Sequence, residues 1–229
     1  MIRTLIISTM FALFLPGTVF AGDDREDIHA SAEQAQPLMP GMMAPAFDVK
    51  NVHGADFHFD PAAMQKPLVL SFYRGGWCPF CNLHLSEMRH AEKELLELGF
   101  DVWFVSIDLP EVLVESLNEP DLGYTLFSDS KLHATRAFGI AFTLDEETLE
   151  RYRKYDIDVE AASGENHHVL PVPSTFIIGQ DGKISFAYSN PDYAVRLHPD
   201  VLLAAARAYT EDADKRLRRQ RAAQRESEK

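Results

Sequence analysis

The chain contains two cysteines, Cys78 and Cys81, which stand three residues apart in the segment WCPFC. A pair at this spacing can cycle between dithiol and disulfide, with one thiolate attacking a substrate and the other closing the disulfide. There are two alternatives: a buried pair with a purely structural role, and one half of a zinc site. Zinc usually takes four nitrogen or sulfur ligands, and the distant pair His167-His168 is the only further candidate. We therefore favour redox use of the pair and expect no metal.

The cysteines lie where a strand is predicted to turn into a helix. Leu68, Val69, Leu70, Phe72 and Tyr73 form a short apolar, β-branched and aromatic run that is typical of a buried strand, and Gly75-Gly76 breaks it. Apolar residues then recur at steps of three and four from Cys81 to Leu98, which predicts a helix that Gly99 can end. The pair is thus expected at the first turn of this helix.

A helix N-terminus gives the first cysteine a chemical advantage. Cys78 is expected at the N-cap, with Pro79 at the first helical position, where its fixed φ fits and its missing N–H costs nothing. Free backbone N–H groups and the helix dipole favour negative charge there, so we expect Cys78 to be a nucleophilic thiolate of lowered pKa. Cys81 falls on the same helix face, close enough to form a disulfide with Cys78.

Four segments in order carry a resemblance to a known family. The segment SFYRGGWCPFC resembles the active-site segment of thioredoxin-fold proteins, and is most similar to the peroxiredoxin-like branch of the alkyl hydroperoxide reductase/thiol-specific antioxidant family. The likeness continues through LFSDSKLHATRAFGIAF, LPVPSTFIIGQDGKISFAYSNPDY and the helix after it, and covers roughly residues 40–210. It implies an α/β fold: a thioredoxin-like three-layer α/β/α sandwich with a mixed central sheet, over residues 41–210.

The resemblance also implies roles for residues near the cysteines. Pro173 resembles a proline that is cis in thioredoxin-like folds and lies against the cysteine pair. A cis bond there would turn the Val172 backbone toward Cys78, where it could bind a substrate as a strand edge does. The alternative is a trans proline at the start of a strand. Trp77 is expected to shield Cys78 and order the turn at the substrate site. Arg74 either stabilises the thiolate and polarises a peroxide bond, or is a surface charge. His84 is expected on the helix surface.

The chain departs from the family pattern at three positions. Typical peroxiredoxins carry Pro-x-x-x-Thr-x-x-Cys before the attacking cysteine, and here those two positions are Ser71 and Gly75. They also use an arginine from a later strand, at the position of Pro173. The usual peroxide-activating residues are therefore not visible, whereas the Cys-x-x-Cys pair favours disulfide exchange.

The rest of the domain reads as alternating strands and helices, which predicts parallel βαβ pairing. Asp-Gly at 181–182, between two apolar runs, is a strong hairpin signal, and residues 159–168 read as a loop. Strands are expected at 46–50, 56–59, 101–107, 125–127, 173–178 and 183–188, and helices at 110–117, 131–138, 145–155 and 198–209.

The two ends of the chain differ from the domain in composition. Residues 1–21 resemble a secretory signal peptide, with Arg3 before an apolar run and small residues before a cut after Ala21; the run is short for a membrane span. Residues 22–40 read as an acidic linker, and 211–229 as a charged tail that is a frayed helix or disordered. We expect export to the periplasm, where disulfides persist, with no stable membrane span after cleavage.

Charge narrows the list of partners. Cleavage would remove one basic residue and no acid, leaving 21 basic against 35 acidic residues, which argues against nucleic acid as a partner.

The cysteine pair and the family resemblance leave three hypotheses for the function: a peroxidase that reduces hydroperoxides, a disulfide oxidoreductase that acts on protein disulfides, and a binding module whose cysteines staple a turn. In the peroxidase, which we favour, Cys78 attacks, Cys81 resolves, and a thioredoxin-like donor reduces the Cys78–Cys81 disulfide without another cofactor.

Overall fold

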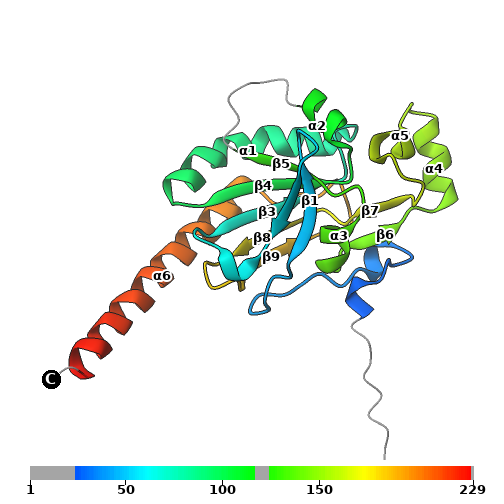
Figure 1. Ribbon diagram of the computed structural model, residues 1–229. Helices are drawn as coiled ribbons and strands as arrows, with labels where there is room; N and C mark the ends of the chain where they lie inside the picture. The colour runs from blue at the N-terminus through cyan, green and yellow to red at the C-terminus, as the bar shows by residue number, and fades with distance from the viewer. Residues whose placement is uncertain (1–23, 117–123, 228–229) are drawn as a thin grey trace, which may run out of the picture.

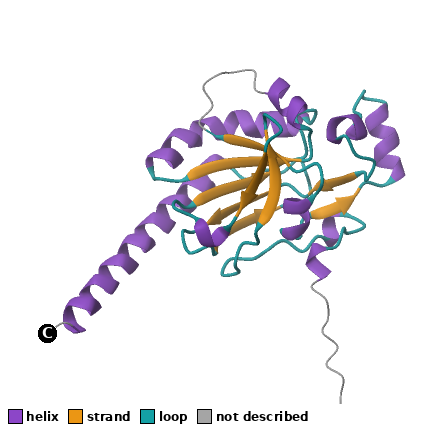
Figure 2. Cartoon of the chain, viewed as in Figure 1, coloured by secondary structure: helices purple, strands orange, loops and turns teal. Residues whose placement is uncertain are grey.

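The computed structural model describes residues 24–116 and 124–227, and its centre is a seven-stranded mixed sheet (Figures 1 and 2). The strand order is β2-β1-β5-β4-β3-β8-β9. The strands are β1 (Phe47–Asn51), β2 (Asp56–Phe59), β3 (Leu68–Phe72), β4 (Asp101–Ser106), β5 (Thr125–Ser128), β8 (Ser174–Ile178) and β9 (Ile184–Ser189). A separate two-stranded sheet joins β6 (Ala141–Thr143) to β7 (Val169–Pro171). The helices are α1 (Pro79–Glu97), α2 (Pro110–Ser116), α3 (His133–Ala137), α4 (Glu146–Arg153), α5 (Val159–Ser163) and α6 (Pro199–Ser227).

Strand pairing confirms the predicted mixture of parallel and antiparallel neighbours. Strands β3, β4 and β5 run parallel to one another, because α1 and α2 carry the chain back between them. Strands β1, β2, β8 and β9 are joined to the sheet in antiparallel pairs. The predicted hairpin β8–β9 forms, and β1 and β2 form a second one. Gly182 in the second hairpin has φ 72°, a conformation that glycine adopts without a side-chain clash.

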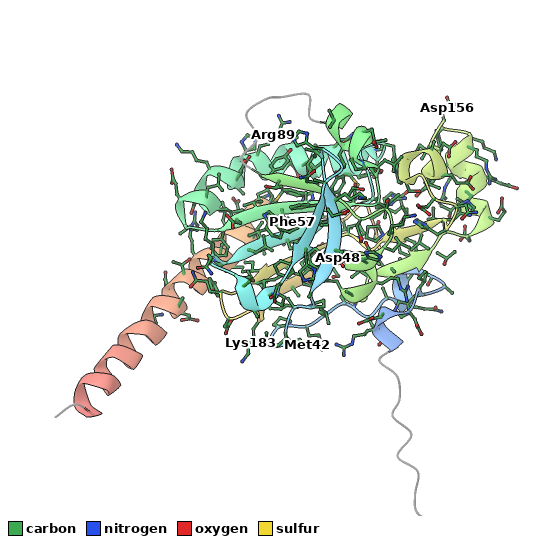
Figure 3. All side chains as sticks on the ribbon, viewed as in Figure 1. Met42, Asp48, Phe57, Arg89, Asp156 and Lys183 are labelled. Carbon is green, nitrogen blue, oxygen red and sulfur yellow. The ribbon has the colours of Figure 1, made fainter. Side chains whose placement is uncertain are left out.

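Helices cover both faces of the sheet, which gives the three expected layers. Alternate residues of β4 point to opposite faces: Phe104 joins the core under α1 and α6, and Val105 joins the core under α3. Phe57, labelled in Figure 3, packs edge-on against Trp103 with their ring centroids 5.3 Å apart. The sheet therefore holds α1, and with it the cysteines, against a continuous apolar layer.

The segment before β1, read from composition as a linker, packs against the domain where the structure describes it. The backbone of His29 exchanges hydrogen bonds of 2.9 Å with Ala141 and Thr143 of β6. Further along, the Gln36 N–H donates to Gly139 O at 2.9 Å, and Leu38 is buried. Residues 24–40 thus form part of the face that also carries β6. The signal-peptide prediction lies outside the described residues.

Two further expectations need correction or extension. The predicted loop at 159–168 contains a short helix, α5, because the Asp158 side chain accepts the Ala161 N–H at 2.9 Å and Gly164 ends the turn with φ 69°. The final helix was expected at 198–209, but α6 continues through the charged tail to Ser227 and extends away from the domain (Figure 1). No helix in the described ranges is long and apolar enough to cross a bilayer.

The packing of α1 on the sheet, which holds the cysteines in place, can be tested at the buried face of this helix. Leu95 is 0% exposed and its neighbour Leu96 is 41% exposed. We expect Leu95→Ala to lower the free energy of unfolding by about 2–5 kcal/mol, because it leaves a cavity between helix and sheet. Leu96→Ala is the matched control and should cost roughly 0.5 kcal/mol or less. Urea unfolding followed by circular dichroism measures both, and equal losses would contradict this packing.

Candidate active site

Both cysteines lie buried at the start of α1, directly after the central strand. Cys78 is the N-cap residue, with φ −91° and ψ 115°, and Pro79 opens the helix as predicted. The Cys78 thiol makes no capping hydrogen bond to the first turn, whereas the Cys81 N–H donates to Cys78 O at 3.0 Å. Both thiols are free, and their residues are only 2% and 0% exposed. Disulfide formation between them stays a prediction.

Arg74 lies beside Cys78 and is not a surface charge. It is 3% exposed, and its Nη1 lies 3.8 Å from Cys78 Sγ. Its guanidinium also sits against three aromatic rings, 4.0 Å from the centroid of Tyr193, 5.3 Å from that of Trp77 and 5.4 Å from that of Tyr152. Ring faces attract a cation through their quadrupole, so these three rings hold the guanidinium where it can pair with a thiolate.

A second arginine, which the sequence did not single out, contacts the other thiol. Arg196 Nη2 lies 3.2 Å from Cys81 Sγ, and its Nε donates to Tyr193 O at 2.7 Å. Arg196 belongs to the loop between β9 and α6, 115 positions from Cys81. A lone arginine in a connecting loop has no spacing signal, so only the folded chain reveals this contact.

The two thiols have opposite acidities. The Cys81 thiol hydrogen-bonds to Cys78 and, with the Arg74 cation, lowers the pKa of Cys78 to about 6 despite its burial. Burial, together with the neighbouring Cys78, raises the pKa of Cys81 well above its usual range. The sequence suggested the helix terminus and Arg74 as reasons for a thiolate at Cys78, but the hydrogen bond from Cys81 is the largest cause. Cys78 is thus the more acidic thiol of the pair.

The turn before Cys78 is shaped by a buried carboxyl group that the sequence analysis missed. Asp108 follows β4, is fully buried, and its Oδ2 accepts the Gly76 N–H at 2.7 Å. Burial raises the pKa of Asp108 to about 6, against the effect of this hydrogen bond. At Gly75, which has φ 153°, a Cβ would lie 2.2 Å from Trp77 Nε1 and 2.6 Å from Asp108 Oδ1. The family's threonine cannot be placed at Gly75 without displacing one of these side chains.

The predicted cis bond at Pro173 is wrong, because no described peptide bond is cis. Val172 is 1% exposed and its backbone is already paired: its N–H donates to Ile140 O at 2.8 Å, and its carbonyl accepts the Ser174 hydroxyl at 2.8 Å. Hydrogen bonds within the protein therefore occupy the edge expected to bind a substrate. Val172 and Pro173 connect β7 to β8 and offer no open docking strand in this structure.

Trp77 and His84 support the site from either end of the cysteine segment. The Trp77 ring lies 5.6 Å from that of Tyr152 and beside Arg74, which agrees with a shielding role. His84, expected on the surface, is buried, and its Nε2 donates to Leu197 O at 3.2 Å. Burial lowers the pKa of His84 to about 4, so its ring is neutral at pH 7. This bond ties the Arg196 loop to α1.

A cavity of about 480 Å³ leads to Arg74 from the surface. Its walls come from the segment before β1, from β6 and α4, and from the loop after β9, and include Ser31, Phe142, Tyr152, Asn190 and Tyr193. Arg74 is one of its lining residues, whereas neither cysteine lines it. Within the described part of the chain, no group of three or more His, Cys, Asp or Glu side chains could hold a metal ion.

Comparisons with known proteins agree with this geometry. The profile of the AhpC/TSA family matches residues 40–187. The peroxiredoxin Bcp of Escherichia coli K12 is 28% identical over 167 residues, which is 73% of this chain and 94% of that protein. Among solved structures, the peroxidoxin BcpB of Mycobacterium tuberculosis has a TM-score of 0.58 at 21% identity, covering 75% of this chain and 97% of that one. Peroxiredoxin Q of Xanthomonas campestris has a TM-score of 0.56 at 18% identity, covering 77% and 98%.

The opposite acidities of the two thiols can be measured by alkylation. In the reduced protein, the rate of reaction with iodoacetamide should rise with a midpoint at about pH 6, because the Cys78 thiolate forms there. Mass spectrometry should place the label on Cys78. Cys78→Ser is the control and should remove this phase, because the Cys78 thiolate is lost and the remaining thiol, Cys81, is 0% exposed. A midpoint near 8.5, the pKa of a free thiol, would contradict the proposed activation.

Proposed function

The chain belongs to the AhpC/TSA family, and we propose that it is a peroxidase in which Cys78 reduces hydroperoxides and Cys81 resolves the oxidised enzyme. Its relatives include a peroxiredoxin that it matches over most of both chains, which supports thiol-dependent oxidoreductase activity. The observation that carries the proposal is the buried pair of Cys78 and Arg74, 3.8 Å apart. Such a pair supplies both the thiolate and the positive charge that peroxide reduction needs.

The first chemical step uses both members of this pair. The Cys78 thiolate attacks one peroxide oxygen, so that an S–O bond forms as the O–O bond breaks. The departing oxygen carries the negative charge away, takes a proton, and leaves as an alcohol or water. Cys78 is oxidised by two electrons to a sulfenic acid. Arg74 can donate a hydrogen bond to the departing oxygen while that charge develops.

Arg74 is the substitute for the activating set that the sequence lacks. The family's arginine position is Pro173, and its threonine position is Gly75. Arg74 enters instead from the turn directly before Cys78, and the rings of Trp77, Tyr152 and Tyr193 hold its guanidinium in place. The positive charge beside the attacking sulfur is thus supplied from a different part of the chain.

The second step and the return to the dithiol complete the cycle. The Cys81 sulfur attacks Cys78, forming the disulfide and releasing water, and an external dithiol then reduces the disulfide by exchange. We propose a thioredoxin-like donor for this reduction, and no metal or prosthetic group. The sequence of residues 1–21 supports export, so we place the enzyme in the periplasm.

Disulfide exchange with proteins is the second candidate, because the Cys-x-x-Cys pair stands at a helix N-terminus. The environment of the pair argues against it. A protein disulfide must reach a thiolate that is 2% exposed, and the Val172 edge that could dock a peptide strand is hydrogen-bonded inside the protein. A binding module is disfavoured because a purely structural pair has no need of an arginine beside each sulfur, one of them buried.

Single substitutions at the two cysteines test the proposed order of attack. Cys78→Ser should abolish peroxide turnover, because the activated thiolate is lost. Cys81→Ser should still react once with hydrogen peroxide and accumulate a sulfenic acid on Cys78, which dimedone labels and mass spectrometry locates. Stopped-flow fluorescence of the wild-type protein, alongside its rate with a protein disulfide, gives the reference. Labelling of Cys81 in Cys78→Ser, or faster reaction with the protein disulfide, would overturn the proposal.

Removing the guanidinium beside Cys78 tests the role of Arg74. We expect Arg74→Met to slow the reaction with hydrogen peroxide on the order of 10²-fold, the effect of losing one donor to a developing negative charge. Arg153→Met is the matched control, since Arg153 is an exposed residue of α4 that pairs with Glu146 at 2.9 Å, and its rate should equal that of the wild type. An unchanged rate in Arg74→Met, with circular dichroism showing a folded protein, would remove Arg74 from the mechanism.

A further inference from the structure

Each thiol of the pair has a guanidinium in contact with it, and the attack on peroxide proposed above uses only that of Arg74. Arg74 Nη1 lies 3.8 Å from Cys78 Sγ, and Arg196 Nη2 lies 3.2 Å from Cys81 Sγ. We propose that Arg196 is a catalytic residue of the second half-reaction, in which it stabilises Cys81 as the thiolate that attacks oxidised Cys78. This inference rests on the proposed function, because it assigns a residue to that function's resolving step.

Arg196 is held in a position from which it can perform this role. Its Nε donates to Tyr193 O at 2.7 Å, which leaves Nη2 directed at Cys81. The loop that carries it is fixed to α1 at two points: the His84 ring donates to Leu197 O at 3.2 Å, and Phe80 packs against Tyr193 with centroids 5.6 Å apart. The guanidinium is therefore preorganised and needs no rearrangement before the thiolate forms.

Cys81 needs such a partner because it is 0% exposed. Burial makes a thiolate costly, and in the reduced enzyme the negative Cys78 opposes a second charge close by. Five titratable or charged groups act on Cys81 or flank it: Tyr73 directly after β3, Arg74 from the turn, Cys78 and His84 from the start of α1, and Arg196 from the β9–α6 loop. Of these groups, Arg196 is the cation in contact with the Cys81 sulfur.

Oxidation of Cys78 changes this balance in favour of the second step. The sulfenic acid carries no negative charge, so two causes that raise the pKa of Cys81 disappear: the charge of Cys78 and its hydrogen bond from the Cys81 thiol. Burial then remains, opposed by Arg196. The pKa of Cys81 is thus lower after Cys78 has reacted than before, and the reduced enzyme does not hold two thiolates in one buried site.

The resolving step balances without a further reactant. The Cys81 thiol loses its proton, and the thiolate attacks Cys78 Sγ. An S–S bond forms as the S–O bond of the sulfenic acid breaks, and the departing hydroxide takes a proton and leaves as water. Cys81 is oxidised as Cys78 is partly reduced, and the external dithiol later returns both to thiols.

Two-phase stopped-flow kinetics separates the roles of the two arginines. After mixing with hydrogen peroxide, the first phase depends on peroxide concentration and reports sulfenic acid formation, whereas the second does not and reports disulfide closure. We expect Arg196→Met to slow the second phase on the order of 10- to 100-fold at pH 7, the scale of losing a donor to a buried charge, and to change the first phase far less. Dimedone should then label Cys78 more strongly.

The pH profile and a conservative variant distinguish catalysis from a structural effect. Without the cation the pKa of Cys81 rises, so the second phase of Arg196→Met should recover at alkaline pH, and Arg196→Lys should restore part of the rate at neutral pH. Arg207→Met is the matched control: Arg207 is an exposed arginine of α6 that pairs with Glu94, and both phases should equal those of the wild type. A first phase slowed as much as the second, or a pH profile that keeps its wild-type midpoint, would overturn the inference.

A second assay keeps the test independent of peroxide chemistry. An aromatic disulfide such as dithiobis(nitrobenzoate) reacts with Cys78 to release one coloured thiolate, and attack by Cys81 on the mixed disulfide releases a second. Slower release of only the second thiolate in Arg196→Met supports the inference, even if the wild type fails to reduce peroxides and the proposed function falls. Unchanged release of the second thiolate would refute the role of Arg196 even if peroxide reduction is observed.

Discussion

The structure around the site depends on one constraint, which is that a negative sulfur must exist where water is excluded. A buried ion is strongly destabilised unless it is paired and hydrogen-bonded. Cys78 meets this requirement through the Cys81 thiol and the Arg74 guanidinium, and the guanidinium in turn rests on the rings of Trp77, Tyr152 and Tyr193. Those rings come from the turn before α1, from α4 and from the loop after β9, so three distant segments must fold together before the thiolate is stable.

The same constraint accounts for the departures from the family pattern. The space that a side chain at position 75 would take is filled by Trp77 and Asp108, which fix the turn that carries Arg74. Ser71, at the family's proline position, lies inside the sheet between β4 and β8, and its hydroxyl pairs with that of Thr175 at 2.8 Å. Because Arg74 in this turn supplies the positive charge, position 173 does not need an arginine. Pro173 can occupy it and only connects the chain to β8.

The sequence predicted what short-range patterns control. A short continuous apolar run placed β3, and the three-to-four periodicity with Pro79 placed α1 and its N-cap at Cys78. Contacts between distant segments were beyond such patterns: Asp108 lies 32 positions from the Gly76 N–H that it accepts, and Arg196 lies 115 positions from Cys81. The cis form at Pro173 was implied by the resemblance alone, and no described peptide bond is cis.

Burial of the pair also bears on the kind of substrate that the site favours. The described cavity leads to Arg74, and its walls include residues 30–33 and α4, elements outside the central sheet. A peroxide oxygen is small enough to be carried through such an opening to the guanidinium, whereas a protein disulfide must bring its own backbone to a sulfur that is 2% exposed. In the proposed cycle, the external dithiol that reduces the disulfide meets the same barrier. The loop at 190–198 contributes to it, because Tyr193 packs on Arg74 and Arg196 contacts Cys81.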